Sequence, residues 1–429
     1  MKIKRISARG DELQEFLNSK KADQMSFLDT VSAIAAQVKA EGDQAIFALT
    51  EKFDGVRLNA DNFRVSSEEI DDAYEQVGDE YLDALLKAVD NLFAYHERQL
   101  RNSWMETDAA GNITGQIFSP LERVGVYVPG GTAAYPSSVL MNVIPAQTAG
   151  VREIAMVSPP GKNGRLNPYT LVAAAELGIT EIYKVGGAQA IFGLAWGTDI
   201  IRPVDLISGP GNIFVTLAKK MVYGDVNIDM LAGPSEILII ADASADPKFV
   251  AADLMSQAEH DVLASSVLVT DNEALLERVE AELDRQLAGL SRRDIITRSL
   301  EQGGRMLLAA DLIEACEVAN QMAPEHLELM VQQPFEWLSR IKNAGAIFMG
   351  AYTPEPVGDY FAGSNHILPT GGTARFYSGV TVDTFRKSSS MVYYSREGLL
   401  QAADDIICLA EVEGLTAHAN SIKVRKVNE

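Results

Sequence analysis

Apolar runs and helical patterns alternate along the middle of the chain, and no other feature limits the possible folds as strongly. Strands are predicted at Val124–Val128, Glu153–Val157, Glu181–Val185 and Pro203–Ile207. A helical pattern follows each run, which predicts a parallel sheet with right-handed crossovers and helices on both faces. Glycine-containing turns follow three of these strands, at the edge where such sheets bind ligands.

The alternation resumes in the second half of the chain. Strands are predicted at Ile237–Ala241, Ser265–Val269, Arg305–Ala309, His326–Met330 and Ala344–Met349. The sequence therefore predicts an α/β protein with two Rossmann-like, doubly wound parallel-sheet domains, plus small helical or extended elements at both ends of the chain. The C-terminal element contains one clear amphipathic helix, from Ser395 to about Glu413.

Composition narrows the class of protein. The 429 residues are enough for two or three domains, and 47% of them are apolar. A net charge of −22 repels phosphate backbones and anionic membranes, so we expect no nucleic-acid or membrane partner. The basic N-terminus lacks the apolar run of a signal peptide, and two cysteines cannot form a disulfide framework. We therefore expect a cytoplasmic protein.

A metal site is one interpretation of the segment Ser256–Asp261. Gln257 and His260 are three residues apart and share one face if the preceding helix continues. An imidazole and an amide oxygen could hold two corners of such a site, although zinc takes amide oxygen rarely. The spacing alone favours the alternative, a polar last turn of a surface helix.

Other polar residues lie where chain segments begin or end. Glu325 and His326 stand side by side at a strand entry after Pro324, as an acid/base pair or as a surface turn. Asp359 and His366 occupy a glycine-rich loop, and His418 follows the last predicted helix. Four of the five histidines thus lie in loops or at element ends, which favours a metal site; His96, in an amphipathic helix, is assigned no chemistry.

The glycine turns are weak indications of nucleotide binding when taken singly. Gly209-Pro210-Gly211-Asn212 could bring a helix N-terminus to a pyrophosphate, but it lacks the third glycine of the dinucleotide fingerprint. A plain tight turn explains it equally well. Three such turns in one α/β segment are a better indication than any one of them.

The chain resembles the histidinol dehydrogenase family nearly from end to end, from Gly42-Asp43 to Ala417-His418-Ala419. The motifs that carry the resemblance are long and specific. They include the segments Val126–Gly131, Gly186–Ala190, Ser208–Asn212, Ala232–Glu236, Ser256–Asp261, Ala323–Leu327, Asn365–Thr370 and Gly372–Phe376. The resemblance implies oxidation of L-histidinol to L-histidine by two NAD, through an aldehyde, in the last step of histidine biosynthesis.

The resemblance also implies roles for individual residues. One zinc would be held by Gln257, His260, Asp359 and His418, and Glu325 and His326 would be the acid/base pair. The substrate would meet Ser235, Glu413, His326 and the metal ligands. NAD would contact Tyr127, Gln189 and Asn212.

Four parts of the chain follow from this reading. We expect an N-terminal arm in residues 1–24 and an NAD-binding domain in residues 127–236. Residues 25–126 and 237–380 would form a discontinuous zinc-binding catalytic domain. The tail, residues 381–429, would complete the partner's active site in a homodimer, although it could also fold back on its own chain.

Two alternatives stay open at this point. One is a sibling dehydrogenase with the same zinc and NAD sites, such as the sulfopropanediol branch of the family. The other is a non-catalytic, metal-dependent binding module, against which the intact Glu325-His326 pair argues. A thiol route to the acid is rejected, because Cys316 and Cys408 both lie among apolar helix residues and are expected to be buried and inert.

Overall fold

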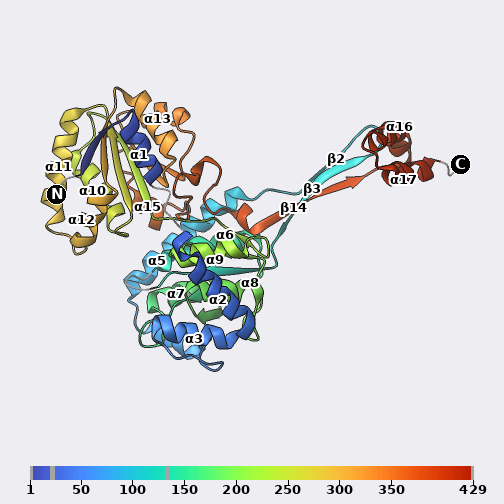
Figure 1. The fold of residues 1–429 in the computed structure, drawn as a ribbon, viewed down its shortest axis with the longest axis horizontal. Coiled ribbons are helices and arrows are strands. Elements are labelled where there is room, and N and C mark those ends of the chain that lie inside the picture. Colours follow the sequence, from blue (N-terminus) through green and yellow to red (C-terminus); the bar gives the residue numbers. More distant parts are fainter. Residues whose placement is uncertain (1–2, 20–24, 131–134, 427–429) are drawn as a thin grey trace. The chain divides into compact units, whose positions relative to one another are not determined.

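The computed structural model describes residues 3–19, 25–130 and 135–426, and it divides into two units (Figure 1). The first unit comprises Met1–Gln99 and Leu121–Phe385, and the second comprises Leu100–Pro120 and Arg386–Glu429. Two parallel sheets lie in the first unit, and an antiparallel sheet lies in the second. Among the described helices, none is long and apolar enough to span a membrane.

The first parallel sheet has five strands in the order β6-β5-β4-β7-β8. Its strands are β4 (Arg123–Tyr127), β5 (Glu153–Ser158), β6 (Glu181–Lys184), β7 (Leu206–Ser208) and β8 (Asn227–Ile228). Its crossover helices are α6 (Pro136–Ala149), α7 (Pro168–Glu176), α8 (Gly187–Trp196) and α9 (Ile213–Val222). The chain reverses direction across the sheet between β6 and β7, so β4 and β7 flank the switch point where ligands usually bind.

Four N-terminal helices complete the layers on this sheet. They are α2 (Leu28–Glu41), α3 (Asp43–Asp54), α4 (Ser67–Tyr74) and α5 (Asp79–His96). α2 and α3 pack with α8 on one face, and α4 and α5 pack with α7 and α6 on the other. The expectation that residues 25–126 belong with residues 237–380 is therefore wrong. The apolar face of a helix shows that the helix must be covered, but not which sheet covers it.

The second parallel sheet has six strands in the order β1-β11-β10-β9-β12-β13. Its strands are β1 (Lys4–Ser7), β9 (Glu236–Ala241), β10 (Ser265–Thr270), β11 (Arg305–Leu308), β12 (His326–Met330) and β13 (Ala346–Met349). One face is covered by α10 (Pro247–Ala258), α11 (Glu273–Leu287) and α12 (Arg293–Gln302). The other face is covered by α1 (Asp11–Ser19) and α13 (Leu312–Met322). The described part of the expected N-terminal arm is thus an edge strand and a covering helix.

Short elements connect these layers within the first unit. They are η1 (Met25–Phe27), η2 (Glu97–Gln99), α14 (Pro334–Trp337), η3 (Leu338–Arg340), α15 (Glu355–Tyr360), η4 (Thr373–Arg375) and η5 (Val382–Phe385). α15 begins directly after Pro354 and carries Asp359 near its end.

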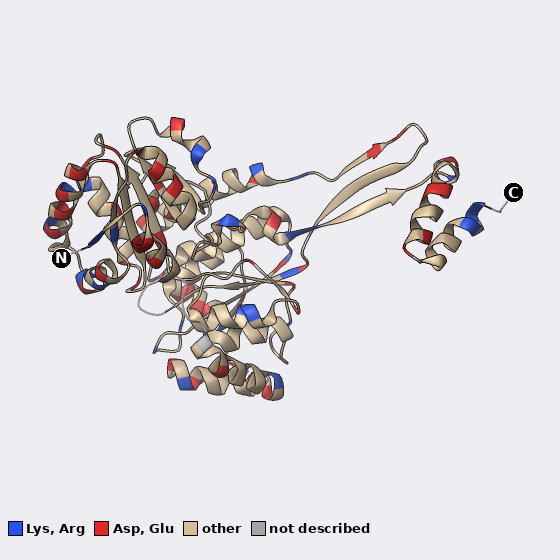
Figure 2. Ribbon diagram, turned by 45° about the horizontal axis from the view of Figure 1, so that its top comes forward, with Lys and Arg blue, Asp and Glu red and all other residues tan. Residues whose placement is uncertain are grey.

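The second unit combines two distant segments of the chain. β2 (Trp104–Thr107), β3 (Ile113–Pro120) and β14 (Arg386–Tyr393) form an antiparallel sheet in the order β14-β3-β2. The helices α16 (Arg396–Val412) and α17 (Thr416–Lys426) follow, and both carry acidic and basic residues (Figure 2). Ion pairs Lys423–Glu411 and Lys426–Asp404 connect the two helices. The expected tail helix is confirmed as α16. The tail boundary is incomplete, however, because residues 100–120 supply two of the three strands.

Candidate active site and metal centre

An irregular turn at the start of β12 brings Glu325 and His326 together. Ala323 ends α13 in the left-handed region (φ 48°), which non-glycine residues seldom adopt. The Oε2 atom of Glu325 accepts the N–H of Glu236 at 2.8 Å, and the Nδ1 atom of His326 lies 3.0 Å from the carbonyl oxygen of Glu236. The irregular entry expected at Pro324 is present, and both side chains meet at the first residue of β9.

Burial favours the uncharged form of both members of this pair. Only 6% of Glu325 and 3% of His326 is exposed. Burial raises the pKa of Glu325 well above its usual range, and it lowers the pKa of His326 to about 4. His326 is therefore a neutral imidazole near neutral pH, which is the form that can accept a proton, while burial favours the protonated form of Glu325.

The surroundings of His326 decide which ring nitrogen is the base. Nδ1 faces two acceptors, the carbonyl oxygen of Glu236 and the Oε1 atom of Gln257 at 2.9 Å, so Nδ1 carries the proton. Nε2 then holds the lone pair. It is buried without a hydrogen-bond partner in the described chain, and it lies 3.9 Å from the Oδ1 atom of Asp359.

A group of possible metal ligands lies beside this base. One ligand atom each from His260, Glu355 and Asp359 lies within 4.8 Å of the others, and nitrogen with carboxylate oxygens is a donor set that zinc accepts. Gln257, in the last turn of α10, is fully buried, and its Oε1 atom retains a second lone pair. The structure thus brings Gln257, His260 and Asp359 to one place, next to His326.

Glu355 was not expected at this site. It is the first residue of α15, one helical turn before Asp359, and a carboxyl oxygen of each lies within 4.8 Å of the other. Its Oε2 atom accepts the hydroxyl of Ser256 at 3.3 Å, while its Oε1 atom lies 3.7 Å from the Nε2 atom of His260. The only indication in the sequence is the four-residue spacing between Glu355 and Asp359, which places two side chains on one face of a helix. The flanking prolines argue against a helix here, so the spacing was not interpreted in that way.

The remaining expected site residues fall into two groups. Ser235 is half-buried and directly precedes Glu236, which contacts the Glu325-His326 pair. His366 is also near, with Nδ1 3.2 Å from the carbonyl oxygen of Asp359. Glu413 and His418 are exposed and belong to the second unit, so they are not part of the unit that holds the other candidates.

The three residues expected to contact NAD occupy one edge of the five-stranded sheet. Tyr127 ends β4, and its hydroxyl accepts the N–H of Gly187 at 3.1 Å. Gln189 is buried in the first turn of α8, and the side chain of Asn212 accepts two N–H groups as the N-cap of α9. Gly209, after β7, has φ 124° and leaves no space for a Cβ beside the Tyr127 carbonyl oxygen, so this turn requires glycine.

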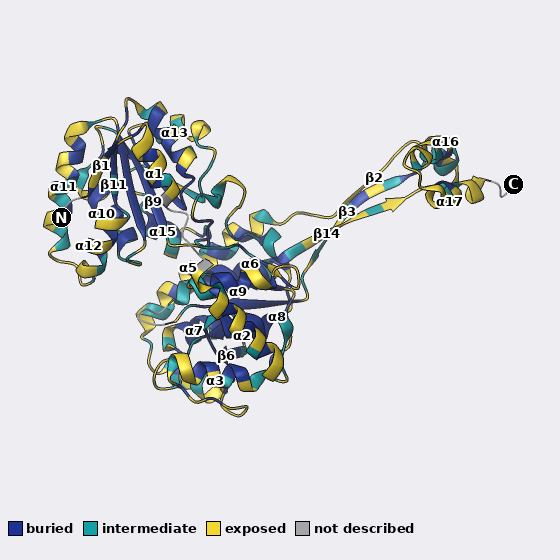
Figure 3. Ribbon diagram, in the orientation of Figure 1, coloured by how far each residue is buried: buried dark blue, intermediate teal, exposed yellow. Residues whose placement is uncertain are grey.

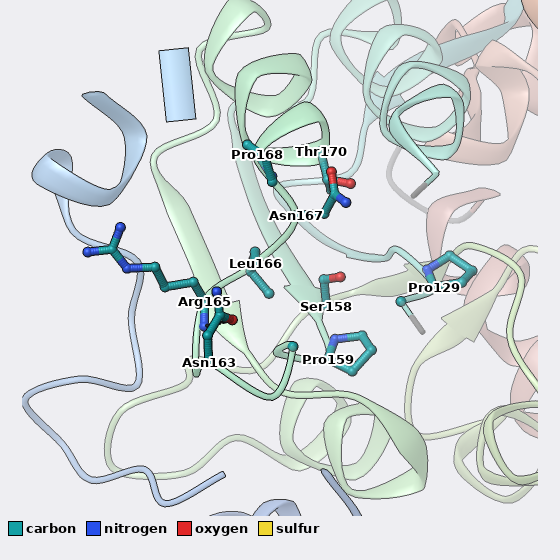
Figure 4. A pocket seen from close by; sticks show the side chains of 11 residues that line it. Pro129, Ser158, Pro159, Asn163, Arg165, Leu166, Asn167, Pro168 and Thr170 are labelled. Atoms are coloured by element: carbon teal, nitrogen blue, oxygen red, sulfur yellow. Dashed lines mark hydrogen bonds between the residues drawn. The ribbon is translucent and has the colours of Figure 1, made fainter. Parts of the chain in front are cut away.

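A cavity of about 230 Å³ opens at the same edge, between the ends of β4 and β5 and the start of α7 (Figure 4). Its lining includes Pro129, Ser158, Pro159, Asn167 and Thr170. Gly131, the second glycine of the turn after β4, lies outside the described residues. The cavity is at the carboxyl end of the strands, where α/β sheets hold cofactors.

Comparisons with known proteins identify the relatives of this chain. The family model described as histidinol dehydrogenase matches residues 17–426. The chain belongs to the histidinol dehydrogenase family. Histidinol dehydrogenase of Heliobacterium mobile is 54% identical over 423 residues, and that of Bacillus subtilis is 53% identical over 426 residues, each covering 99% of both chains. The crystal structure of histidinol dehydrogenase from Elizabethkingia anophelis matches with a TM-score of 0.89 and 38% identity, covering 98% of this chain and 94% of that one.

Membership of the histidinol dehydrogenase family confirms the resemblance and the α/β fold that the sequence indicated. The protein is therefore an oxidoreductase, and the reading as a non-catalytic binding module is wrong. The sulfopropanediol alternative receives no support. These relatives are named histidinol dehydrogenase, and they align with this chain over nearly their whole length.

Proposed function

We propose that this enzyme oxidises L-histidinol to L-histidine, with zinc to hold the substrate and NAD to accept the electrons. Converting a primary alcohol to a carboxylate removes four electrons, so one histidinol and one water consume two NAD and release three protons. The observation that carries the proposal is the buried Nε2 atom of His326, without a hydrogen-bond partner in the described chain and 3.9 Å from Asp359 of the candidate metal group, in a chain of this family.

The residues at the metal group fit a zinc ion. The Oε1 atom of Glu355 and the Nε2 atom of His326 are buried and lack hydrogen-bond partners in the described chain. The pocket therefore contains two electron-pair donor atoms that no protein group occupies. Gln257, His260 and Asp359 would hold the ion, with His418 as the fourth ligand. A zinc bound there would orient the substrate and polarise its reacting hydroxyl.

His326 and Glu325 would divide the proton transfers. The unprotonated Nε2 atom of His326 takes the proton of the substrate hydroxyl, and the two acceptors at Nδ1 stabilise the positive charge that forms. Glu325 activates the water that adds to the aldehyde, a role that needs its carboxylate form. The N–H of Glu236 stabilises the resulting carboxylate.

NAD is proposed to bind at the switch-point edge of the five-stranded sheet, near Tyr127, Gln189 and Asn212. The buried hydroxyl of Tyr127 is already engaged with Gly187, so its role there is to shape the turn before α8. NAD supplies the acceptor for the hydride that the chain cannot provide itself.

A homodimer is proposed to complete each site, with Glu413 and His418 supplied by the partner. The second unit supports this idea, because its sheet and helices are mostly uncovered (Figure 3). Leu409 and Val412 of α16 are 69% and 82% exposed, and exposed apolar surface of this kind marks association surfaces.

One assay tests the proposed function. Purified enzyme with limiting histidinol and excess NAD should form two NADH per histidinol, because the aldehyde is oxidised on the same enzyme. A chelator should abolish the signal, and added zinc should restore it. One NADH per histidinol, or full activity in metal-free enzyme, would contradict the proposal.

A further inference from the structure

Three elements that carry site residues meet at one buried carboxyl group, that of Glu328. Glu328 follows His326 by two residues on β12, so both side chains point to the same face of the sheet. The Oε1 atom of Glu328 accepts the N–H of Glu355, the first residue of α15, at 2.9 Å. Its carboxyl group also lies against that of Asp253 on α10, and burial together with the negative charge of Asp253 raises the pKa of Glu328. One side chain therefore connects β12, α10 and α15.

The helix α15 needs such an anchor. It has six residues, and its N-cap, Pro354, offers no side-chain hydrogen bond. A helix this short is not stable by itself, and its first N–H groups need acceptors from elsewhere. Glu328 supplies the acceptor for the first of them, inside the protein, where only 2% of Glu328 is exposed.

The contact between Glu328 and Asp253 requires a proton. Two buried carboxylates at hydrogen-bond distance repel each other unless one of them is protonated. Burial raises the pKa of Glu328 well above its usual range and that of Asp253 to about 6. A single shared proton lets the two carboxyl groups stay in contact with one negative charge left on the pair, while Glu328 keeps an oxygen for the N–H of Glu355.

The position of α15 determines the position of Asp359. Asp359 lies one turn after Glu355, and a carboxyl oxygen of each lies within 4.8 Å of the other. Ser256, adjacent to Gln257 on α10, donates to Glu355 at 3.3 Å. A shift at the first turn of α15 would therefore move Asp359 relative to His260.

We propose that Glu328 is a positioning residue, which holds Asp359 in place for zinc binding and turnover by anchoring the first turn of α15 to β12 and α10. The inference rests on the proposed function, because the place of Asp359 matters only if Asp359 binds the metal. Glu328 itself touches neither metal nor substrate in this scheme. A residue that only filled space would be replaceable by an apolar side chain of similar volume.

Two substitutions separate anchoring from packing. Glu328→Gln keeps an oxygen for the N–H of Glu355 and gains an amide for Asp253, so zinc affinity and kcat should stay within about threefold of wild type. Glu328→Leu fills a similar volume without an acceptor. It should weaken zinc binding and lower kcat by about 10- to 100-fold, as changes behind a metal site usually do. Zinc affinity is measured by titrating metal-free protein against a chelating dye.

Ser299→Ala is the matched control for stability. Ser299 is buried on α12 beside the same sheet, and its hydroxyl donates to the carbonyl oxygen of Ala264; neither residue is among the candidate site residues. This variant should melt at a lower temperature but bind zinc and turn over like wild type. If Glu328→Leu does not fold, Glu328→Ser replaces it: serine leaves room for water but cannot reach Glu355, and the same loss is expected.

Two outcomes would overturn the inference. One is wild-type zinc affinity and kcat in folded Glu328→Leu, or in Glu328→Ser in its place. The other is a Glu328→Gln variant as impaired as these, because the anchoring oxygen is then not what matters. Failure of the proposed function appears differently, as wild-type enzyme without zinc-dependent histidinol oxidation.

Discussion

The Nδ1 atom of His326 lies 2.9 Å from the Oε1 atom of Gln257, so the proposed base and one proposed metal ligand share a hydrogen bond. This bond fixes the imidazole tautomer and directs the lone pair of Nε2 away from Gln257. A change at the metal group can therefore reach the base directly, both through this bond and through Asp359, whose Oδ1 atom lies 3.9 Å from Nε2. Substitutions at the two sites should nevertheless have separable effects.

Replacing His326 by alanine should stop turnover while zinc stays bound. The proposed ligand set is intact in this variant, but the proton acceptor is gone, so kcat should fall by about 10²- to 10⁴-fold. Zinc content by atomic absorption and histidinol binding by calorimetry provide the comparison. His96→Ala is the matched control: His96 is another buried histidine, bonded to Gln99, and its removal should leave zinc content and kcat unchanged.

Replacing His260 by alanine should remove metal and activity together while the protein stays folded. His260 is one of three residues whose ligand atoms lie within 4.8 Å of one another, and removing one of so few ligands weakens a zinc site strongly. Circular dichroism checks the fold, and zinc per chain checks the site. Full zinc occupancy in this variant would refute the assignment.

Replacing Glu325 by glutamine should harm aldehyde oxidation more than alcohol oxidation. Only the aldehyde must be hydrated, and a glutamine amide cannot accept the proton of water. Histidinol and histidinal, offered separately, distinguish the two half-reactions. Equal losses in both would contradict the water-activating role of Glu325.

His326 should make the metal-free protein less stable in acid. Burial lowers its pKa to about 4 in the folded state, whereas an unfolded histidine titrates near 6.5. The unfolded chain therefore binds the extra proton first as pH falls. The stability contribution is fully present above about pH 6.5 and is lost progressively down to about pH 4. Relative to His326→Gln, wild type should lose about 3 kcal/mol of unfolding free energy over this range, measured by urea titration. Parallel curves for the two proteins would count against a buried, neutral His326.

Mixing two inactive variants tests whether the tail serves the partner's site. His260→Ala and His418→Ala should each be inactive as pure dimers. After refolding together, a heterodimer would have one site with both lesions and one with neither. Random pairing should restore about one quarter of wild-type activity, because about half of the dimers carry one intact site each. No recovery despite confirmed heterodimers would mean that the tail serves its own chain.

Much of the fold could be predicted from local pattern. Strands such as Ile237–Ala241 are continuous apolar runs because both faces of a parallel sheet are covered, and such runs stand out from the helices between them. The packing of α2 and α3 on the five-stranded sheet could not be predicted, because it depends on contacts between distant segments. The pairing of β14 with β3 could not be predicted for the same reason.

The site was partly predictable for related reasons. Gln257 and His260 share a helix turn, and Glu325 and His326 are adjacent, so local spacing indicated both pairs. Glu355 and Glu328 belong to the site through contacts that cross from one element to another, and no spacing in the sequence records such contacts. The cytoplasmic location and the homodimer stay predictions.

The three-stranded sheet of the second unit has a consequence for how the protein reaches its working state. β2 is exposed along its whole length, and β14 is exposed along most of its length. An isolated sheet with solvent on both faces gains little free energy from forming. Its strands come from segments more than 260 residues apart in the chain, so their pairing also closes a long loop. Folding of this unit should therefore be coupled to association, and its melting temperature should rise with protein concentration. Dilution alone would then dissociate the dimer and abolish activity before the parallel sheets begin to unfold.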